Sequence, residues 1–280
     1  MLTIAHWAAT VLADYKRPRL VHVVDALPRN ALGKVVRAEL RSAPRARAAG
    51  DPVGVLGVGA SGPGAPMTAG RGGIRSRPDR VLEERAREQG FTRPAGVDEV
   101  GRGAWAGPVS VGVVVPGESA PPSGVRDSKL VPERQRAGLR DAVVAWAADW
   151  AVGHASPGEC DELGMRRALR LAALRALDQL GSPPDVLLLD GPVDYLDPAP
   201  TPVWPEVGGD RTSVAIAAAS VVAKVVRDEL MASLAPSFPA FDFDRNKGYP
   251  SPSHRRALAG VGLSSLHRRS WSYVERLPFR

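Results

Sequence analysis

The chain has 280 residues, 44% hydrophobic content and a formal net charge of +7. This length suits one sizeable core or one domain plus a tail, and the basic charge favours a polyanionic partner. The single cysteine, Cys160, excludes an internal disulfide framework and a cysteine-based zinc site. No apolar run approaches the roughly 20 residues that span a bilayer, and no basic region opens a signal peptide. We therefore expect a soluble, cytoplasmic protein without a membrane partner.

The composition divides the chain into three parts. Residues 1–43 contain a strand-like run at 20–24 and a helix-like end at 34–41. Residues 44–78 are rich in Gly, Pro, Ala and Arg, and cannot bury enough apolar surface to offset their ordering entropy. We expect this segment to be a flexible, disordered linker. Residues 79–280 carry all the strong patterns and are expected to form the main domain.

Strand and helix patterns are mixed within residues 79–280. The patterns predict helices over 80–89, 132–150, 158–180, 213–234 and 251–260, and strands running into Asp98 and over 108–115, 151–156 and 185–190. The run at 185–190 is continuously apolar, which is typical of a buried central strand. The helix at 213–234 is rich in small residues and could pack very closely on a neighbour. This mixture predicts an α/β domain with one central sheet flanked by helices.

Acidic residues stand at the ends of the predicted strands. Asp98 and Glu99 precede a glycine-rich turn, Asp190 closes the apolar run, and Asp210 lies in a polar turn before the small-residue helix. Buried acids repel one another, and a divalent cation removes the repulsion. Oxygen ligands suit Mg²⁺ or Mn²⁺, which favours metal-assisted phosphate chemistry. Alternatively, these acids are simple caps and turn residues.

Six blocks in order resemble the type 2 ribonucleases H, specifically the bacterial ribonuclease HII family. They are GVDEVGRGAWAGPV from residue 96, RDSKL (126–130), LLLDG (187–191), GDRTSVAIAAASVVAKVVRDELM (209–231), FDFDRNKGYPSPSH (241–254) and LHRRSW (266–271). The resemblance implies an RNase H-like fold with a central mixed sheet. It implies an endonuclease that hydrolyses the RNA strand of RNA–DNA hybrids and cuts 5′ of single ribonucleotides in duplex DNA, as in ribonucleotide excision repair. The products would carry 3′-hydroxyl and 5′-phosphate ends.

The same resemblance implies roles for individual residues. The four metal-binding catalytic carboxylates would be Asp98, Glu99, Asp190 and Asp210. The bound Mn²⁺ or Mg²⁺ would activate the attacking water and stabilise the leaving 3′ oxygen. One departure is Pro192, where the family commonly has Asn, which removes an amide and stiffens the turn after Asp190.

Substrate contacts follow from the resemblance as well. The loop Gly101-Arg102-Gly103 would read the ribose 2′-hydroxyl, and Tyr249 would stack on the neighbouring deoxynucleotide sugar. Further candidate phosphate contacts are Ser128, Lys129, Lys224, Lys247, His267, Arg268 and Arg269. Alternatively, residues 101–103 form a simple tight turn, Tyr249 packs against its neighbours, and residues 267–269 form a solvated basic face. Asp228, by contrast, is expected to be structural.

Residues 13–41 resemble a different family, the C-terminal end of acyl-CoA synthetases, with Lys34 matching its adenylate-contacting lysine. About forty residues cannot perform that chemistry alone, so no ligase activity is expected. Either a remnant is fused to the nuclease, or the true start is Met67, and the second is the hypothesis that we favour. Intact-mass analysis distinguishes them.

Three functions compete on these observations. The first is a metal-dependent nuclease acting on RNA–DNA hybrids and ribonucleotide-containing duplexes without an obligate protein partner. The second is a non-catalytic nucleic-acid-binding module, suggested by the charge alone. The third is an adenylate-forming enzyme or its regulator, suggested by residues 13–41. The presence of all four acids favours the nuclease.

Overall fold

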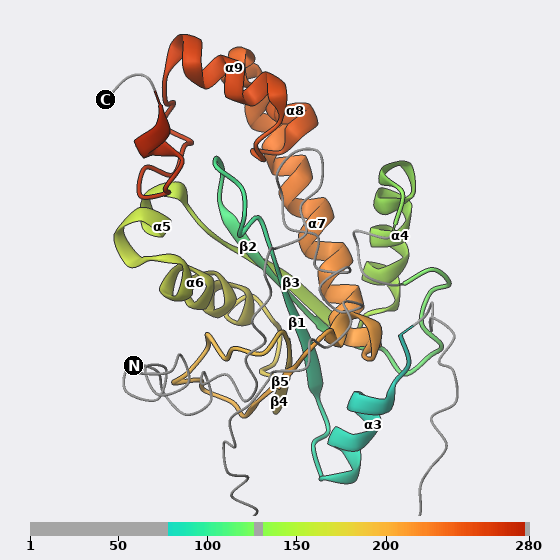
Figure 1. Cartoon of the computed structure of the whole chain (residues 1–280). Helices are drawn as coiled ribbons and strands as arrows, with labels where there is room; N and C mark the ends of the chain where they lie inside the picture. The colour runs from blue at the N-terminus through green and yellow to red at the C-terminus, as the bar shows by residue number, and fades with distance from the viewer. Residues whose placement is uncertain (1–77, 126–130, 278–280) are drawn as a thin grey trace, which may run out of the picture. The chain divides into compact units, whose positions relative to one another are not determined.

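The computed structural model describes residues 78–125 and 131–277 (Figure 1). The expected elements at 20–24 and 34–41, the proposed linker up to residue 77, and the block at 126–130 with Ser128 and Lys129 lie outside the described residues. Within the described part, no helix is long and apolar enough to cross a membrane.

A mixed five-stranded sheet in the order β3-β2-β1-β4-β5 forms the centre of the domain. Its strands are β1 Pro94–Val100, β2 Val109–Val115, β3 Asp149–Ala155, β4 Val186–Asp190 and β5 Val203–Glu206. The pairs β1–β2 and β2–β3 are antiparallel, whereas β4 runs parallel to both β1 and β5. The predicted α/β class with a central mixed sheet is confirmed.

One face of the sheet is covered by the long helix α7, Val214–Leu234, as the small-residue pattern predicted (Figure 1). A side chain added at Gly96 of β1 would overlap the Ala215 backbone, and one at Gly112 of β2 would meet the Ala219 carbonyl. The helix backbone therefore lies directly on the strands. Helix α4, Glu133–Trp146, packs beside α7 and completes this layer.

The other face is covered by α6, Met165–Leu177, preceded by α5, Pro157–Leu163. The prediction of a single helix over 158–180 was wrong. Gly164, at φ +73°, ends one helix and begins the next. Ser156 and Glu159 form a reciprocal capping box at the start of α5, which fixes where that helix begins.

The structure differs from the sequence predictions at two further places, the end of α4 and the edge of the sheet. The helix expected over 132–150 ends at Trp146, because Ala147 is extended and the Ala148 amide already donates to the Val115 carbonyl at 3.0 Å. Asp149 and Trp150 consequently begin β3. Strand β5 was not predicted, since it is four residues long and contains Pro205, which a strand tolerates at the edge of a sheet.

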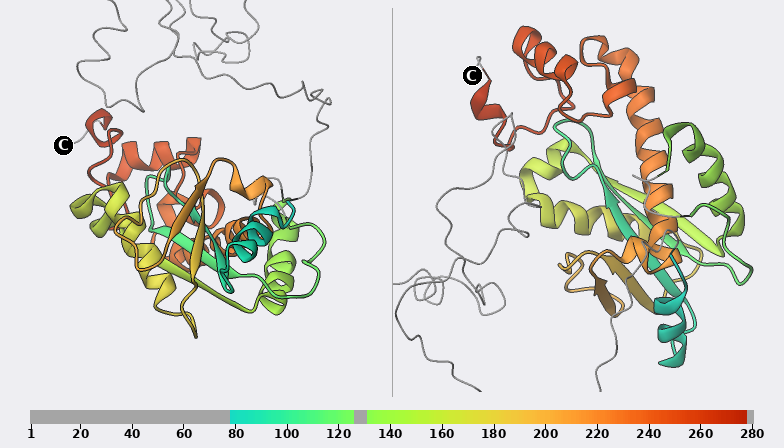
Figure 2. Two further views of the ribbon diagram at one scale, coloured as in Figure 1. Left: turned by 90° about the horizontal axis from the view of Figure 1, so that it is seen from below. Right: turned by 45° about the vertical axis from the view of Figure 1, so that its right-hand side comes forward.

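The remaining elements lie at opposite ends of α7 (Figure 2). Helix α3, Val81–Glu88, was predicted and reaches the α7 N-terminus through Glu83. Beyond the other end lie α8, Phe243–Asn246, and the predicted α9, Pro252–Val261. Short 3₁₀ turns complete the fold at Gly209–Arg211, Ala235–Ser237, Pro239–Phe241 and Val274–Arg276. The C-terminal elements share a third, largely aromatic core.

Candidate active site

Asp98 and Asp190 stand side by side on neighbouring parallel strands. Val97 of β1 is in register with Leu189 of β4, and Asp98 and Asp190 are the next residues on these two strands. Side chains alternate along a strand, so Asp98 shares the α7 face with Gly96. By the same alternation Asp190 shares a face with Leu188, which packs against Ile216 of α7. The two carboxylates therefore share one face of the sheet, just beyond the last residues paired between β1 and β4.

Asp210 joins this pair through the turn that precedes α7. A side chain added at Gly209 would touch Asp190 Oδ1 at 3.5 Å, so the turn lies directly against that carboxylate. Asp98 and Asp210 are each only 6% exposed. Within the described residues, buried Asp190 Oδ1 has no hydrogen-bond partner. A buried carboxylate oxygen without a donor is costly, and a cation would relieve that cost.

Glu99 lies on the opposite face from Asp98, because β1 continues to Val100 without a bulge. Its carboxylate accepts a hydrogen bond from Arg102 Nη1 at 3.3 Å. The sequence pattern therefore identified four acids, but the structure does not place all four on one face.

Tyr195 is a buried residue near the acids that the sequence pattern did not reveal. Burial raises its pKa well above the usual range, and the charges of Glu99, Asp98 and Asp190 raise it further. The charges of three of the four predicted acids therefore act on its hydroxyl. Within the described residues this hydroxyl has no hydrogen-bond partner. No signal in the sequence distinguishes it from an ordinary core tyrosine.

These residues fit a divalent ion only in part. In the described residues, no three His, Cys, Asp or Glu side chains form a group that could hold a metal. Mg²⁺ commonly uses only one or two carboxylates, with water and substrate phosphate completing its shell. Asp98 and Asp190 satisfy that smaller requirement with oxygen donors alone. The Gly191 amide also anchors the turn by donating to the Glu206 carbonyl at 2.8 Å, one residue before Pro192.

The glycine loop, residues 101–103, follows β1 directly. Gly101 has φ +85°, and a side chain there would overlap the guanidinium of Arg227. Gly103, in contrast, has no atom within 4 Å of the position a side chain would take. The Arg102 side chain is 63% exposed. The loop thus packs on the protein at its first glycine and presents open space at its second.

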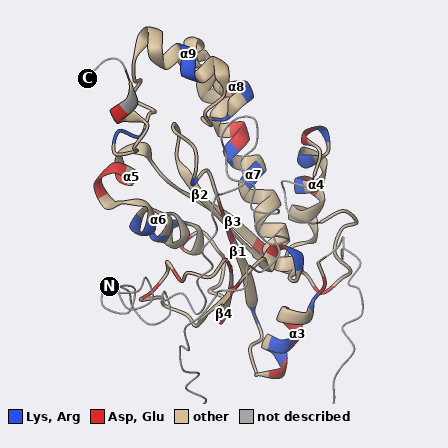
Figure 3. Cartoon of the chain, viewed as in Figure 1, with Lys and Arg blue, Asp and Glu red and all other residues tan. Residues whose placement is uncertain are grey.

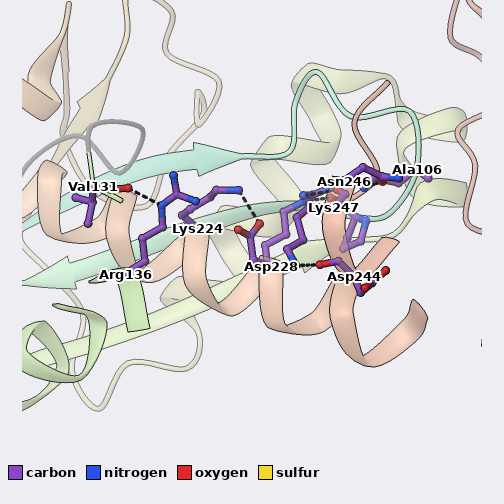
Figure 4. A network of polar contacts seen from close by, with 11 residues as sticks. Ala106, Val131, Arg136, Lys224, Asp228, Asp244, Asn246 and Lys247 are labelled. Carbon is purple, nitrogen blue, oxygen red and sulfur yellow. Dashed lines mark hydrogen bonds and ion pairs between the residues drawn. The ribbon is translucent and has the colours of Figure 1, made fainter. Parts of the chain in front are cut away.

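The tyrosine segment, residues 247–249, lies near α7. Lys224 of α7 forms an ion pair with Asp228 at 2.7 Å (Figure 4), which supports a structural role for Asp228. Burial lowers the pKa of Lys224, although its bond to Asp228 opposes that change. The Tyr249 ring lies 5.9 Å from the Lys224 ammonium, and Lys247 donates to the Asp244 carbonyl.

Two of the expected phosphate contacts are corrected by their burial. His267 is 2% exposed and bonds to His254, while Arg268 is fully buried and donates to main-chain carbonyls. Arg269 is exposed, as a phosphate contact must be. Exposed basic residues also mark α3, α4 and α6 (Figure 3). Of residues 267–269, the HRR pattern, only Arg269 is exposed, so the three residues neither all contact phosphate nor all face solvent.

Comparison with known proteins identifies the class. The model of the family Ribonuclease HII matches residues 95–274. Ribonuclease HII of Streptomyces avermitilis is 52% identical over 184 residues, which cover 66% of this chain and 78% of that protein. Ribonuclease HII of Thermus thermophilus is 44% identical over 189 residues, covering 66% and 89% of the two chains.

Solved structures agree with the sequence comparisons. The ribonuclease H2 from Pyrococcus horikoshii superposes with a TM-score of 0.58 at 28% identity, covering 66% of this chain and 96% of that one. The RNase HII of Archaeoglobus fulgidus, solved in a complex with PCNA, gives a TM-score of 0.52 at 25% identity, covering 64% and 95%.

The fold and the matched segment define a hydrolase of the type 2 ribonuclease H class, an endoribonuclease acting on RNA–DNA hybrids. More specifically, the chain belongs to the ribonuclease HII family. The match begins at residue 95, so residues 13–41 lie outside it. Their resemblance to acyl-CoA synthetases stays a prediction.

Proposed function

We propose that this protein cuts the RNA strand of hybrids and also cuts duplex DNA on the 5′ side of a single embedded ribonucleotide. The products carry 3′-hydroxyl and 5′-phosphate ends. The observation that carries the proposal is the pairing of Asp98 and Asp190 on adjacent parallel strands, with Asp190 Oδ1 buried and unsatisfied within the described residues.

The proposed metal ligands are the acids Asp98, Glu99, Asp190 and Asp210. Asp98 and Asp190 are the direct ligands that the fold supports best, with Asp210 beside them and Glu99 held near by Arg102. Mg²⁺ or Mn²⁺ bound there supplies an acidified attacking water and offsets charge on the leaving 3′ oxygen. The chain itself orients the acids on a rigid sheet and buries them, which strengthens their attraction for a cation.

Substrate recognition is proposed to use the glycine loop and the tyrosine segment together. Open space at Gly103 allows a ribose to approach the main chain closely. Tyr249 provides an aromatic surface for the neighbouring sugar. The proposed phosphate contacts are Arg102, Ser128, Lys129, Lys224 and Lys247, of which Ser128 and Lys129 lie outside the described residues.

The proposal includes no obligate protein partner. The Archaeoglobus fulgidus relative was solved in a complex with PCNA, which shows what that protein can bind. The described domain here contains its own sheet, both covering layers and the candidate acids. We therefore expect the isolated chain to cleave.

The test is cleavage of a DNA duplex that contains one ribonucleotide, with Mg²⁺ or Mn²⁺, by the wild type and Asp98→Asn. A cut 5′ of the ribonucleotide that is lost in the variant supports the proposal. Asp185→Asn is not a suitable control, since Asp185 anchors Thr92 and Arg93. Glu84→Gln on the exposed side of α3 is suitable. Binding without cleavage by the folded wild type would instead favour the non-catalytic module.

For residues 1–43 we propose a remnant without ligase activity, joined by the linker at 44–78 to the nuclease domain at 79–280. The family match from residue 95 supports this division, because it leaves the N-terminal part outside. ATP-dependent adenylate formation by the purified chain would contradict it. The intact mass of the native protein then decides between a fusion and a start at Met67.

A further inference from the structure

Two arginines are fully buried beneath the proposed substrate surface. Arg227 of α7 and Arg268 of the C-terminal segment are both 0% exposed. Burial lowers the pKa of Arg227, and it lowers that of Arg268 to about 10, which keeps Arg268 charged at neutral pH. Burying a cation is costly unless its donors are used. Arg227 uses all three of its guanidinium nitrogens on main-chain carbonyls, whereas Arg268 uses Nε and Nη1 and its buried Nη2 has no partner within the described residues.

Arg227 contacts both segments that are proposed to read the substrate. Its Nε donates to the Pro108 carbonyl at 2.9 Å and its Nη2 to the Ala106 carbonyl at 3.3 Å, on the chain that returns from the glycine loop to β2. Its Nη1 donates to the Lys247 carbonyl at 3.0 Å. Gly101 packs on the same guanidinium.

The aromatic ring of the tyrosine segment also rests on this guanidinium. The Tyr249 ring centroid lies 5.5 Å from Arg227 Cζ, within the range of a cation–π contact. One buried side chain therefore touches the first glycine of the loop, the carbonyl of Lys247 and the ring of Tyr249.

Arg268 holds only the glycine-loop side. Its Nε donates to the Gly107 carbonyl at 3.1 Å, its Nη1 donates to the Arg102 carbonyl at 3.3 Å, and its guanidinium faces the Trp271 ring at 5.0 Å. It provides a natural comparison, because it is equally buried but its main-chain acceptors, Arg102 and Gly107, lie on the glycine-loop side.

We propose that Arg227 is a positioning residue that couples the glycine loop to the tyrosine segment, so that ribose reading and sugar stacking occur in one fixed geometry. Arg268 positions the glycine loop alone. This inference rests on the proposed function of the two segments. It requires the planar fork of arginine, since a lysine ammonium cannot span carbonyls from both segments at once.

The experiment measures kcat and KM for Arg227→Lys and Arg268→Lys on two substrates. One is a duplex with a single ribonucleotide, and the other is a continuous RNA–DNA hybrid. Each variant is also combined with Tyr249→Ala in a double-mutant cycle. Val143→Ala, in the α4–α7 core away from both segments, controls for lowered stability. Arg227→Gln replaces Arg227→Lys if the buried ammonium prevents folding, as judged by circular dichroism.

The expected result is that Arg227→Lys lowers kcat/KM on the single-ribonucleotide duplex about tenfold more than on the hybrid. In the Tyr249→Ala background, most of that extra loss disappears. Arg268→Lys and Tyr249→Ala instead combine additively. Val143→Ala at a matched melting temperature leaves the ratio between the substrates unchanged.

Equal losses on both substrates, or additive effects of Arg227→Lys and Tyr249→Ala, would overturn the coupling and leave Arg227 a structural residue. A wild type that cuts hybrids but not single ribonucleotides is a different result, because it refutes the proposed junction reading itself. The wild-type measurement thus separates failure of the proposed function from failure of the coupling.

Discussion

His254 Nε2 lies 2.9 Å from His267 Nε2 in the aromatic core between α9 and the C-terminal segment. The outer partners define both tautomers. His254 Nδ1 faces the Tyr249 carbonyl, which only accepts, so Nδ1 carries the proton. His267 Nδ1 faces the Ser264 amide, which donates, so His267 carries its proton on Nε2. His267 therefore donates to His254. A second proton on His254 Nε2 would remove the acceptor of this bond, and a second proton on His267 Nδ1 would oppose the Ser264 amide donor.

This pair predicts acid sensitivity of folding. Burial, followed by the charge of His254, lowers the pKa of His267 to about 4, and burial lowers that of His254 as well. Between about pH 4 and 6.5 the unfolded state binds more protons, so stability falls as the pH falls through that window. The His267 shift corresponds to at most about 3 kcal/mol. Urea unfolding from pH 7 to 4 measures it.

The comparison variant is His267→Gln, which removes the titrating imidazole of His267. It should be less stable than the wild type at pH 7 but should lose less stability on acidification. Parallel pH profiles for the two proteins would show that other groups cause the acid sensitivity.

Glu83, which precedes the segment matched by the family model, is expected to contribute to the stability of the fold. Its buried Oε1 accepts from Ser213 Oγ and from the Ala215 amide, both at 2.7 Å, at the N-terminus of α7. Glu83→Ala leaves two buried donors unsatisfied and should cost about 2–4 kcal/mol of unfolding free energy. Thermal and urea unfolding measure this cost.

The matched control for that prediction is Glu84→Ala. Glu84 lies on the same helix, in the same turn, but is exposed. The change there should stay within about 0.5 kcal/mol of the wild type. If both variants lose the same stability, α3 contributes through its helical propensity rather than through the cap.

The elements that could be predicted from sequence are those with strong local patterns. The apolar run of β4 and the alanine-rich α7 lie where the patterns placed them, because burial on both sides and close packing leave a clear composition. The break between α5 and α6 could not be predicted. Glycine is tolerated inside many helices, and only the positive φ of Gly164 separates the two.

The candidate site was predicted by residue type, but its geometry was not. The sequence pattern named Asp98 and Asp190 as two of four acids near strand ends, but β1 runs two residues beyond Asp98. The alternation that sends Glu99 to the other face depends on β1 continuing to Val100. Tyr195 and Arg227 were not singled out because nothing local marks them: Tyr195 is affected by the charges of acids distant in sequence, and Arg227 donates to a carbonyl distant in sequence. Arg268 was misassigned because basic runs give no sign of burial.

Substitutions at Gly101 and Gly103 are expected to have different effects: the first lowers stability, and the second affects substrate binding. Gly101→Ala forces a side chain onto Arg227 at φ +85° and should cost at least about 1–3 kcal/mol in stability. Gly103→Ala has free space and should leave the melting temperature unchanged. If the ribose approaches Gly103 closely, that variant instead raises KM. Calorimetry and steady-state kinetics on both variants check this, and equal melting temperatures would contradict the packing argument.

Asp190→Asn predicts opposite effects on stability and activity. Removing one negative charge from the buried acids relieves repulsion, so without metal the variant should be at least as stable as the wild type. At 100 times its dissociation constant, Mg²⁺ or Mn²⁺ should stabilise the wild type by about 2.7 kcal/mol. The variant should lose most of that gain, together with cleavage. Melting temperatures in EDTA and in a metal titration measure the binding independently of catalysis. An equal metal-induced shift in both proteins would place the ion away from Asp190.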